Sequence, residues 1–126
     1  CYAGAGEPRP ALLRFPADLS DPDQYRDVLA HVRQNGKFDL AICTRTLERL
    51  AQPETLLGIL PVIAKGGYVA VASKFHELAF QESSTSSTRT RGAAHHRWIF
   101  TTDHGVLRVL PKLPSLDADP YFDRFA

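Results

Sequence analysis

Three reactive or polar side chains stand at the end of one short apolar run. The run LAIC at residues 40–43 is followed by Thr44 and Arg45, so a thiol, a hydroxyl and a guanidinium occupy consecutive positions. A nearly continuous apolar run of this length is typical of a strand covered on both faces in a parallel sheet. Ligands of open α/β sheets bind beyond the carboxyl ends of the strands. We therefore expect a binding site at Cys43, Thr44 and Arg45, although cysteine in such a strand is more often a small buried hydrophobe.

A second set of chemically active side chains lies in the second half of the chain. It contains His76, Glu77, His95, His96 and His104. The first four are candidate substrate residues, because imidazole and carboxylate groups exchange protons. Adjacent strand residues point to opposite faces, so a strand that includes both would separate His95 from His96, whereas a strand beginning after His96 would let both turn towards His76 and Glu77. We favour a structural role, with a histidine packed on Trp98 or bonded to a loop, over a zinc site.

The first elements that must position these groups are a strand and a helix. Residues 11–15, ALLRF, are apolar and are closed by Pro16, which predicts a short strand. Asp21 can then cap a helix and Pro22 suits its first position. An apolar stripe at helical spacing follows, formed by Tyr25, Val28, Leu29 and Val32. Gly36 ends this helix.

A second helix and a second buried strand follow the LAIC strand, predicted at residues 38–43. Pro53 opens the helix, which runs through Ile63, and Pro61 predicts a kink or a break because proline lacks a backbone donor. Gly66 and Gly67 then stop the helix, and YVAVAS at 68–73 reads as a strand. This order of elements predicts right-handed crossovers in a parallel sheet, with Asp18, Thr44 and Ser73 at one common edge.

The character of the chain changes after residue 73. The sequence predicts a short helix at 74–81, a mobile polar loop at 82–94 and strands at 96–102 and 106–110. Asp103, His104 and Gly105 form the turn of that hairpin, with Gly105 supplying a positive φ. We expect the sheet to end in this antiparallel pair, residues 1–10 to form a flexible tail, and residues 111–126 to form an extended tail.

Composition and charge exclude several classes of protein. The chain has 126 residues, 44% of them hydrophobic, which allows one core and predicts a single domain. Fifteen basic and fourteen acidic residues leave a formal charge of +1, which indicates neither nucleic acid nor a membrane surface as a partner. Two cysteines make a poor disulfide framework, so we expect a cytoplasmic protein. The sequence lacks methionine and begins with Cys1, so we also expect a segment upstream of it.

The run FDLAICTRTLERLAQPETLLGILPVIAKGGYVAVASK resembles class I S-adenosylmethionine-dependent methyltransferases. In that family an FD-initiated strand, a Leu-Glu-His-like turn, a helix and a strand opened by Gly-Gly follow one another, and here Leu47, Glu48 and Arg49 occupy the turn. ALLRFPADLSDP is similar to the family's third strand and the acidic turn after it. RGAAHHRWIF and GVLRVLPKL resemble the closing hairpin of a bacterial subset. From the sequence alone, Glu48, which lies near Arg45 and Arg49, is most simply interpreted as part of a solvated cluster at a helix start.

The resemblance implies a three-layer Rossmann-like methyltransferase fold that is truncated here. It implies S-adenosylmethionine as the cofactor, with Asp18 approaching the adenine amino group and Leu19, Cys43, Thr44 and Arg45 on the adenine side. The family's first strand, glycine-rich loop and ribose-binding carboxylate would precede residue 11, and ten residues cannot hold them; Gly4 and Gly6 match that loop only superficially. Because the groups that cradle the ribose and the methionine are missing, we expect this chain alone to bind the cofactor weakly or not at all.

Three functional hypotheses follow from these observations. The first is a methyltransferase-like domain with an unknown substrate. The second is a non-catalytic scaffold or a dimerisation module derived from that fold, whose missing strands leave a sheet edge exposed and predict a homodimer. The third is a metal-binding domain that uses the four histidines of the second half and Glu77. Methyl transfer often proceeds by alignment of the reactants, so no catalytic residue is assigned.

Overall fold

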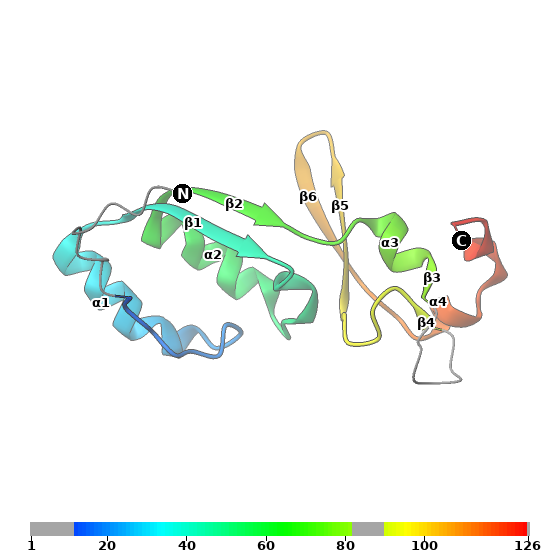
Figure 1. Cartoon of the computed structure of the whole chain (residues 1–126), viewed down its shortest axis with the longest axis horizontal. Helices are drawn as coiled ribbons and strands as arrows, with labels where there is room; N and C mark the ends of the chain where they lie inside the picture. Colours follow the sequence, from blue (N-terminus) through cyan, green and yellow to red (C-terminus); the bar gives the residue numbers. More distant parts are fainter. Residues whose placement is uncertain (1–11, 82–89, 126) are drawn as a thin grey trace, which may run out of the picture.

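The structure is a computed structural model that describes residues 12–81 and 90–125. Figure 1 shows an elongated α/β molecule in which the parallel strands lie at one end, a hairpin crosses the middle and short elements gather at the other end. The strands of the described residues form three separate two-stranded sheets, of which β1–β2 is parallel and the other two are antiparallel. The predicted mixture of a parallel sheet and an antiparallel hairpin is therefore confirmed, but the strands do not form one continuous sheet.

The predicted first helix is confirmed, and its termini behave as the sequence indicates. A 3-10 turn, η1 (Pro22–Tyr25), leads into α1 (Arg26–Asn35), and the Asp21 side chain accepts a hydrogen bond from the Asp23 N–H. Gly36 ends the helix with a φ of 85°. The strand predicted at 11–15 is wrong for its described part, residues 12–15, which adopt no regular structure and pair with no strand. Leu12 is 78% exposed, so this apolar run lacks the partner that would make it a strand.

The parallel pair is built from β1 (Phe38–Thr44), α2 (Pro53–Ile63) and β2 (Ala64–Ala70). Its register runs from Phe38 opposite Ala64 to Thr44 opposite Ala70. β2 begins before the predicted start at residue 68, and Gly66 and Gly67 lie inside it rather than ending the helix. A Cβ on Gly67 would stand 3.3 Å from the Ala41 carbonyl oxygen, so glycine permits the close approach of the two strands. α2 passes through Pro61 and ends two residues later, so the predicted break is absent.

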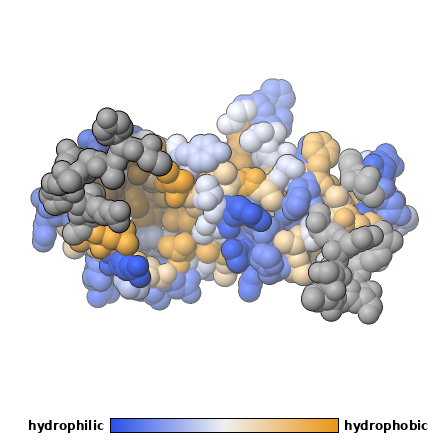
Figure 2. Space-filling model, in the orientation of Figure 1, coloured by the Kyte–Doolittle hydropathy of each residue, from blue (hydrophilic) through white to orange (hydrophobic). Residues whose placement is uncertain are grey.

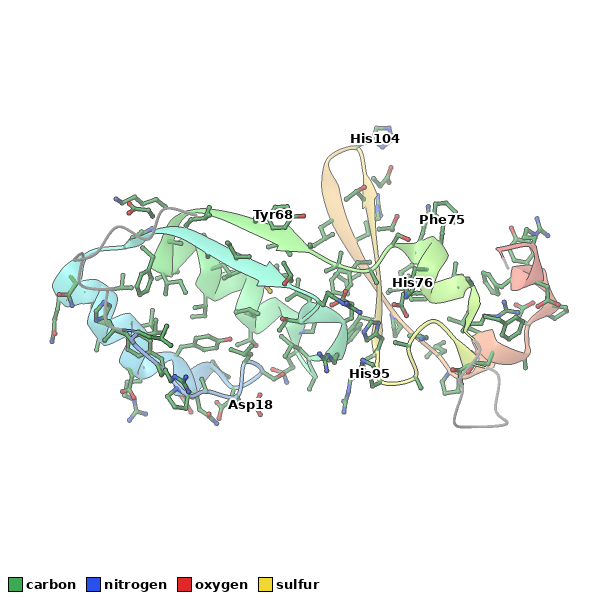
Figure 3. The ribbon with its side chains drawn as sticks, in the orientation of Figure 1. Asp18, Tyr68, Phe75, His76, His95 and His104 are labelled. Atoms are coloured by element: carbon green, nitrogen blue, oxygen red, sulfur yellow. The ribbon has the colours of Figure 1, made fainter. Side chains whose placement is uncertain are left out.

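Only one face of the parallel pair is covered by helices. Figure 1 shows α1 and α2 on the same side of β1 and β2. On the other side Leu40, Ile42 and Tyr68 are 57%, 69% and 60% exposed, and Figure 3 shows Tyr68 pointing away from α2. Figure 2 shows hydrophobic side chains gathered over this half of the molecule. The prediction that the 38–43 strand is covered on both faces is therefore wrong, and within the described ranges no second helix layer completes a three-layer arrangement.

The predicted hairpin is confirmed. β5 (Trp98–Asp103) pairs with β6 (Val106–Pro111) through a turn in which His104 and Gly105 have φ values of 47° and 79°. β5 begins at Trp98, two residues later than predicted, so neither His95 nor His96 lies in the strand. The hairpin meets the chain after β2 through an isolated parallel bridge between Ser73 and Phe100.

The remaining elements differ from the sequence prediction. The helix predicted at 74–81 is shorter, because α3 (Lys74–Leu78) is followed by β3 (Phe80–Gln81), which pairs with β4 (Thr90–Arg91). β4 lies within the predicted mobile loop, of which residues 82–89 are outside the described chain. The predicted extended tail is wrong: β6 continues to Pro111, and α4 (Ser115–Ala118) and η3 (Pro120–Phe125) follow.

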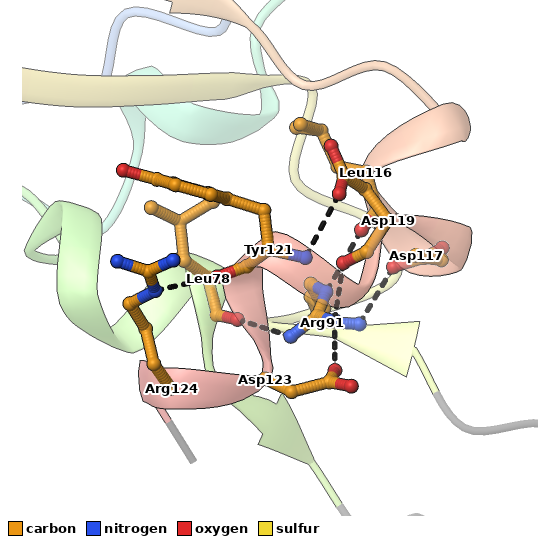
Figure 4. Close-up of polar contacts among 8 residues, drawn as sticks. All are labelled: Leu78, Arg91, Leu116, Asp117, Asp119, Tyr121, Asp123 and Arg124. Carbon is orange, nitrogen blue, oxygen red and sulfur yellow. Dashed lines mark hydrogen bonds and ion pairs between the residues drawn. The ribbon is translucent and has the colours of Figure 1, made fainter.

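One buried arginine holds these short elements together. The Arg91 guanidinium donates to the carbonyl oxygens of Leu78, Leu116 and Asp119 and forms a 2.6 Å ion pair with Asp123 (Figure 4). It also lies 3.9 Å from the centre of the Phe80 ring. Because the arginine is only 1% exposed, its polar groups must be paired inside the protein, and the C-terminal elements fold back to supply the acceptors.

A small core connects the parallel pair with the hairpin. It contains the buried residues Tyr25, Cys43, Leu47, Leu56 and Phe100. Phe100 comes from the hairpin, whereas the other four belong to the half that carries the parallel pair. In the part of the chain that the structure describes, no helix is both long and apolar enough to cross a membrane.

Candidate functional site

The carboxyl end of the parallel pair presents two of the predicted site residues. Thr44 ends β1 and is exposed, and Arg45 follows it with a φ of 52° and an exposed side chain. The Arg45 N–H donates to the Ala70 carbonyl oxygen at 3.0 Å, which continues the strand pairing beyond β1. Cys43 is 7% exposed and belongs to the core. Burial, with a smaller contribution from the charge of Glu48, raises the pKa of its thiol above the usual value, so Cys43 is an inert packing residue.

The turn that contains Asp18 and Leu19 lies beside the segment that follows β1. The Ser20 hydroxyl oxygen accepts a 3.1 Å hydrogen bond from the Ala51 N–H. Leu19 packs against the core, and its carbonyl oxygen accepts a hydrogen bond from the Tyr25 hydroxyl. Asp18 is exposed, and one of its carboxylate oxygens accepts from the Ser20 N–H. This turn is thus attached through Ser20 to Ala51 in the segment after β1, and the common edge expected for Asp18, Thr44 and Ser73 stays a prediction.

Glu48, in the turn η2 (Leu47–Arg49), joins three distant segments. One carboxylate oxygen accepts a 2.6 Å hydrogen bond from the Ala72 N–H, and the Glu48 carbonyl oxygen accepts one of 2.7 Å from the Arg97 N–H. The side chain is fully buried, so its interpretation as part of a solvated cluster is wrong. Its second carboxylate oxygen, Oε2, is buried without a hydrogen-bond partner among the described residues. The cost of burying this carboxylate is offset in part by the connection it makes between β2 and the hairpin.

Two residues of the second candidate set, Glu77 and His96, form a buried charge cluster with Lys112 between α3 and the hairpin. Glu77 Oε1 lies 2.7 Å from His96 Nδ1, and Glu77 Oε2 lies 3.1 Å from Lys112 Nζ. Lys112 also donates to the Ala93 carbonyl oxygen at 2.8 Å. The His96 and Lys112 side chains are 7% and 9% exposed, and Glu77 is fully buried. A carboxylate that accepts from Nδ1 fixes the orientation of the imidazole and leaves Nε2 as the proton acceptor of the neutral ring.

The other histidines lie at different places around this cluster. The His95 ring meets His96 edge-on with the ring centres 4.7 Å apart. Burial, followed by the charge of His96, lowers the pKa of His95 below its usual value. Figure 3 shows His76 on α3, and it shows His104 at the tip of the hairpin, far from His95. His104 pairs there with Asp103 at 2.7 Å. Among the residues that the structure describes, no three side chains of the metal-binding types converge on one position.

Sequence reasoning missed Lys112, which belongs to the charge cluster, and Gly92, which packs against Glu77. Lys112 continues the hairpin beyond β6, where its N–H donates to the Arg97 carbonyl oxygen. The hairpin register, counted outward from Gly105, could have placed Lys112 beside the two histidines. Gly92 has a φ of 54°, and a Cβ on it would stand 2.3 Å from Glu77 Oε2 and 2.7 Å from Glu77 Cα. No signal in the sequence indicates that contact, because it depends on how the chain packs over α3.

Comparisons with protein-family models, curated proteins and solved structures give no match for this chain. Whether an S-adenosylmethionine site is present must therefore be judged from the residues themselves. The described glycines with positive φ are Gly36, Gly92 and Gly105, and none of them follows a strand of the parallel pair. A glycine turn with positive φ that follows a strand of the parallel pair, whose backbone amides could cradle the methionine end, is thus not found in residues 12–81 and 90–125.

Proposed function

We propose that this chain is an S-adenosylmethionine-dependent methyltransferase-like domain with a Rossmann-like parallel sheet. The observation that carries the proposal is the parallel pairing of β1 with β2 across α2, with Thr44 and Arg45 exposed at its carboxyl end. The Asp18 turn, attached to this end through Ser20, supports the same proposal. An exposed carboxylate there can accept hydrogen bonds from an adenine amino group.

We propose that the histidine cluster belongs to the substrate side of this domain. The Glu77–His96 pair supports a proton-accepting role because the carboxylate orients the ring. His95 adds a second, exposed imidazole, and desolvation and the charge of His96 lower its pKa below the usual value. The substrate itself is not specified by these residues. A formal charge of +1 supports a small molecule rather than a nucleic acid as substrate. Cys43, which is buried and forms no disulfide, supports a cytoplasmic location.

The cofactor half of the proposal is tested by calorimetry with S-adenosylhomocysteine. Because most polar groups of the ligand lack partners, and each loss costs about 1–3 kcal/mol, we expect weak binding, with a dissociation constant above roughly 100 µM. Asp18→Ala should weaken it further, whereas Asp117→Ala, at the far end of the molecule, should not. Equal affinity of the two variants would contradict the proposed adenine side. A low-micromolar constant for the unmodified chain would contradict the impaired site.

A second candidate function is dimerisation, and it has its own observation. The face formed by Leu40, Ile42 and Tyr68 is exposed, and neither outer edge of the β1–β2 pair is joined to another strand among the described residues. Exposed apolar faces and open edges are frequent sites of self-association. Light scattering after size exclusion should show a dimer that Ile42→Asp dissociates. Val106→Asp, which changes another exposed apolar residue, on the hairpin, is the control. A monomer at all concentrations would eliminate this function.

A further inference from the structure

A cavity lies beside α3, and none of Glu77, His96 and Lys112 lines it. It has a volume of about 340 Å³ and lies between the segment after β2 and the hairpin. Its lining combines apolar side chains, three hydroxyls and one ammonium group: Val71, Ala72, Ser73, Lys74, Phe75, Phe100, Thr101, Thr102 and Leu107. Small-molecule sites typically have this size and this mixture of an apolar wall with a few polar groups.

We propose that this cavity is a binding site for a small aromatic carboxylate. The inference does not rest on the methyltransferase-like function, because the lining contains none of the residues on the adenine side. Three properties of the lining select the ligand: its charge, its aromatic surface and its hydroxyl groups.

Charge selects an anion. Lys74 is the one charged residue in the lining, and no carboxylate lines the cavity to neutralise it. Lys74 is exposed and forms no ion pair with a described acidic side chain. A carboxylate at the cavity mouth would therefore meet an ammonium group that is not engaged by an internal counterion. A cationic ligand would be repelled by the same group.

The aromatic wall selects a planar ring. Phe75 is 57% exposed although it lines the cavity, and Figure 3 shows it projecting from α3 beside the hairpin. The Lys74 ammonium lies 5.3 Å from the centre of the Phe75 ring. A carboxylate that reaches Lys74 therefore brings a ring attached to it next to Phe75, where aromatic pairs are stabilised beyond the burial of their area. Phe100 and Leu107 supply the apolar floor, and burying Phe75 under a ligand removes its surface from water.

A hydroxyl at the hairpin side can bond the carboxylate. Thr101 and Thr102 are neighbours on β5, so their side chains point to opposite faces of the hairpin. Thr102 lies opposite Leu107 and on the same face as Phe100, and both of these residues line the cavity. Within the described ranges the Thr102 hydroxyl forms no hydrogen bond with another protein group, so it is available to a ligand, whereas the Ser73 hydroxyl accepts from the His76 N–H and caps α3. The carboxylate would thus lie between Lys74 and Thr102.

The test is a titration of the whole ¹⁵N-labelled chain with phenylacetate, followed by amide chemical shifts. The probe should shift the amides of residues 71–75 and 100–102. Cyclohexylacetate, which keeps the charge but lacks the aromatic ring, should bind more weakly, and benzylamine, which reverses the charge, should not bind. No shift of the lining amides at about 5 mM phenylacetate, or equal binding of benzylamine, would overturn the proposal.

Variants separate specific recognition from general attraction between charges. Lys74→Gln should weaken phenylacetate binding by at least about threefold. Arg108→Gln removes the same charge from an exposed position outside the lining, 62% exposed, and should leave the affinity unchanged. Phe75→Leu should abolish the preference for phenylacetate over cyclohexylacetate. All three changed positions are exposed, so melting temperatures should remain at the value of the unmodified chain. Equal weakening by Lys74→Gln and Arg108→Gln would refute the site.

Discussion

Replacing Gly92 by alanine should destabilise the protein more than the same substitution at Gly36 or Gly105, the other described glycines with positive φ. Gly92 lies against Glu77, and a Cβ there would stand 2.7 Å and 2.9 Å from the Cα and carbonyl oxygen of Glu77, in addition to its carboxylate. Backbone atoms cannot rotate away as the end of a side chain can. The clash must therefore displace either α3 or the segment that carries His95 and His96.

The magnitude follows from two separate costs. A φ of 54° places Gly92 in the left-handed region, which costs an alanine about 1–2 kcal/mol. Overpacking of a well-filled site adds about 1–3 kcal/mol. The two together predict a loss of about 2–5 kcal/mol in the free energy of unfolding. Any displacement of Glu77 would also separate it from Lys112 and His96, which lie 3.1 Å and 2.7 Å away. We therefore expect a loss in the upper half of this range.

Gly105 provides a matched control for this measurement. Its φ is 79°, yet a Cβ on it would meet nothing within 4 Å, so Gly105→Ala should cost only the backbone strain of about 1–2 kcal/mol. Urea unfolding can be followed by the fluorescence of Trp98, the one tryptophan of the sequence, whose indole donates to the Leu50 carbonyl oxygen. Equal stability losses for Gly92→Ala and Gly105→Ala would refute the close packing of Gly92 on Glu77.

Three further predictions use the same unfolding assay or simple chemistry. Arg91→Lys cannot reproduce the guanidinium contacts and should cost about 2–4 kcal/mol, whereas Arg124→Lys, at an exposed position, should cost little; equal costs would contradict the buried arginine. Because the folded protein lowers the pKa of His95, the contribution of His95 to stability should be complete above the ordinary histidine pKa and should decrease as the pH drops below about 6.5. His95→Gln should remove that decrease, and an unchanged slope would contradict the shift. In a Cys1→Ser variant, a thiol reagent should label Cys43 only at the rate of unfolding, and immediate labelling would contradict its burial.

The sequence predicts those elements whose signals are local. Asp21 and Gly36 mark the ends of the first helix because a capping carboxylate and a positive φ act on the nearest backbone groups. Gly105 marks the hairpin for the same reason. The pairing of β1 with β2 also follows from local patterns, because two apolar runs separated by a helix predict a parallel crossover.

The features that the sequence did not predict depend on distant contacts. Gly66 and Gly67 resemble a helix stop, but their lack of a side chain serves the approach of β2 to β1. Glu48 has polar neighbours in sequence, and its burial is set by the amides of Ala72 and Arg97, which come from other elements. Ile42 shows the opposite case. An apolar run predicts that both faces of the strand are buried, but one face is exposed because no described element packs on it.

The central claim, an adenine side at the carboxyl end of the parallel pair, is tested most directly by titrating the ¹⁵N-labelled chain with adenosine. Adenosine contains the adenine that we propose these residues bind, and it omits the methionine end of the cofactor. At millimolar concentration it should shift the amides of residues 18–20 and 44–46, and Asp18→Ala should reduce those shifts. Unchanged amides in both segments, or shifts confined to the far end around Arg91, would contradict the claim.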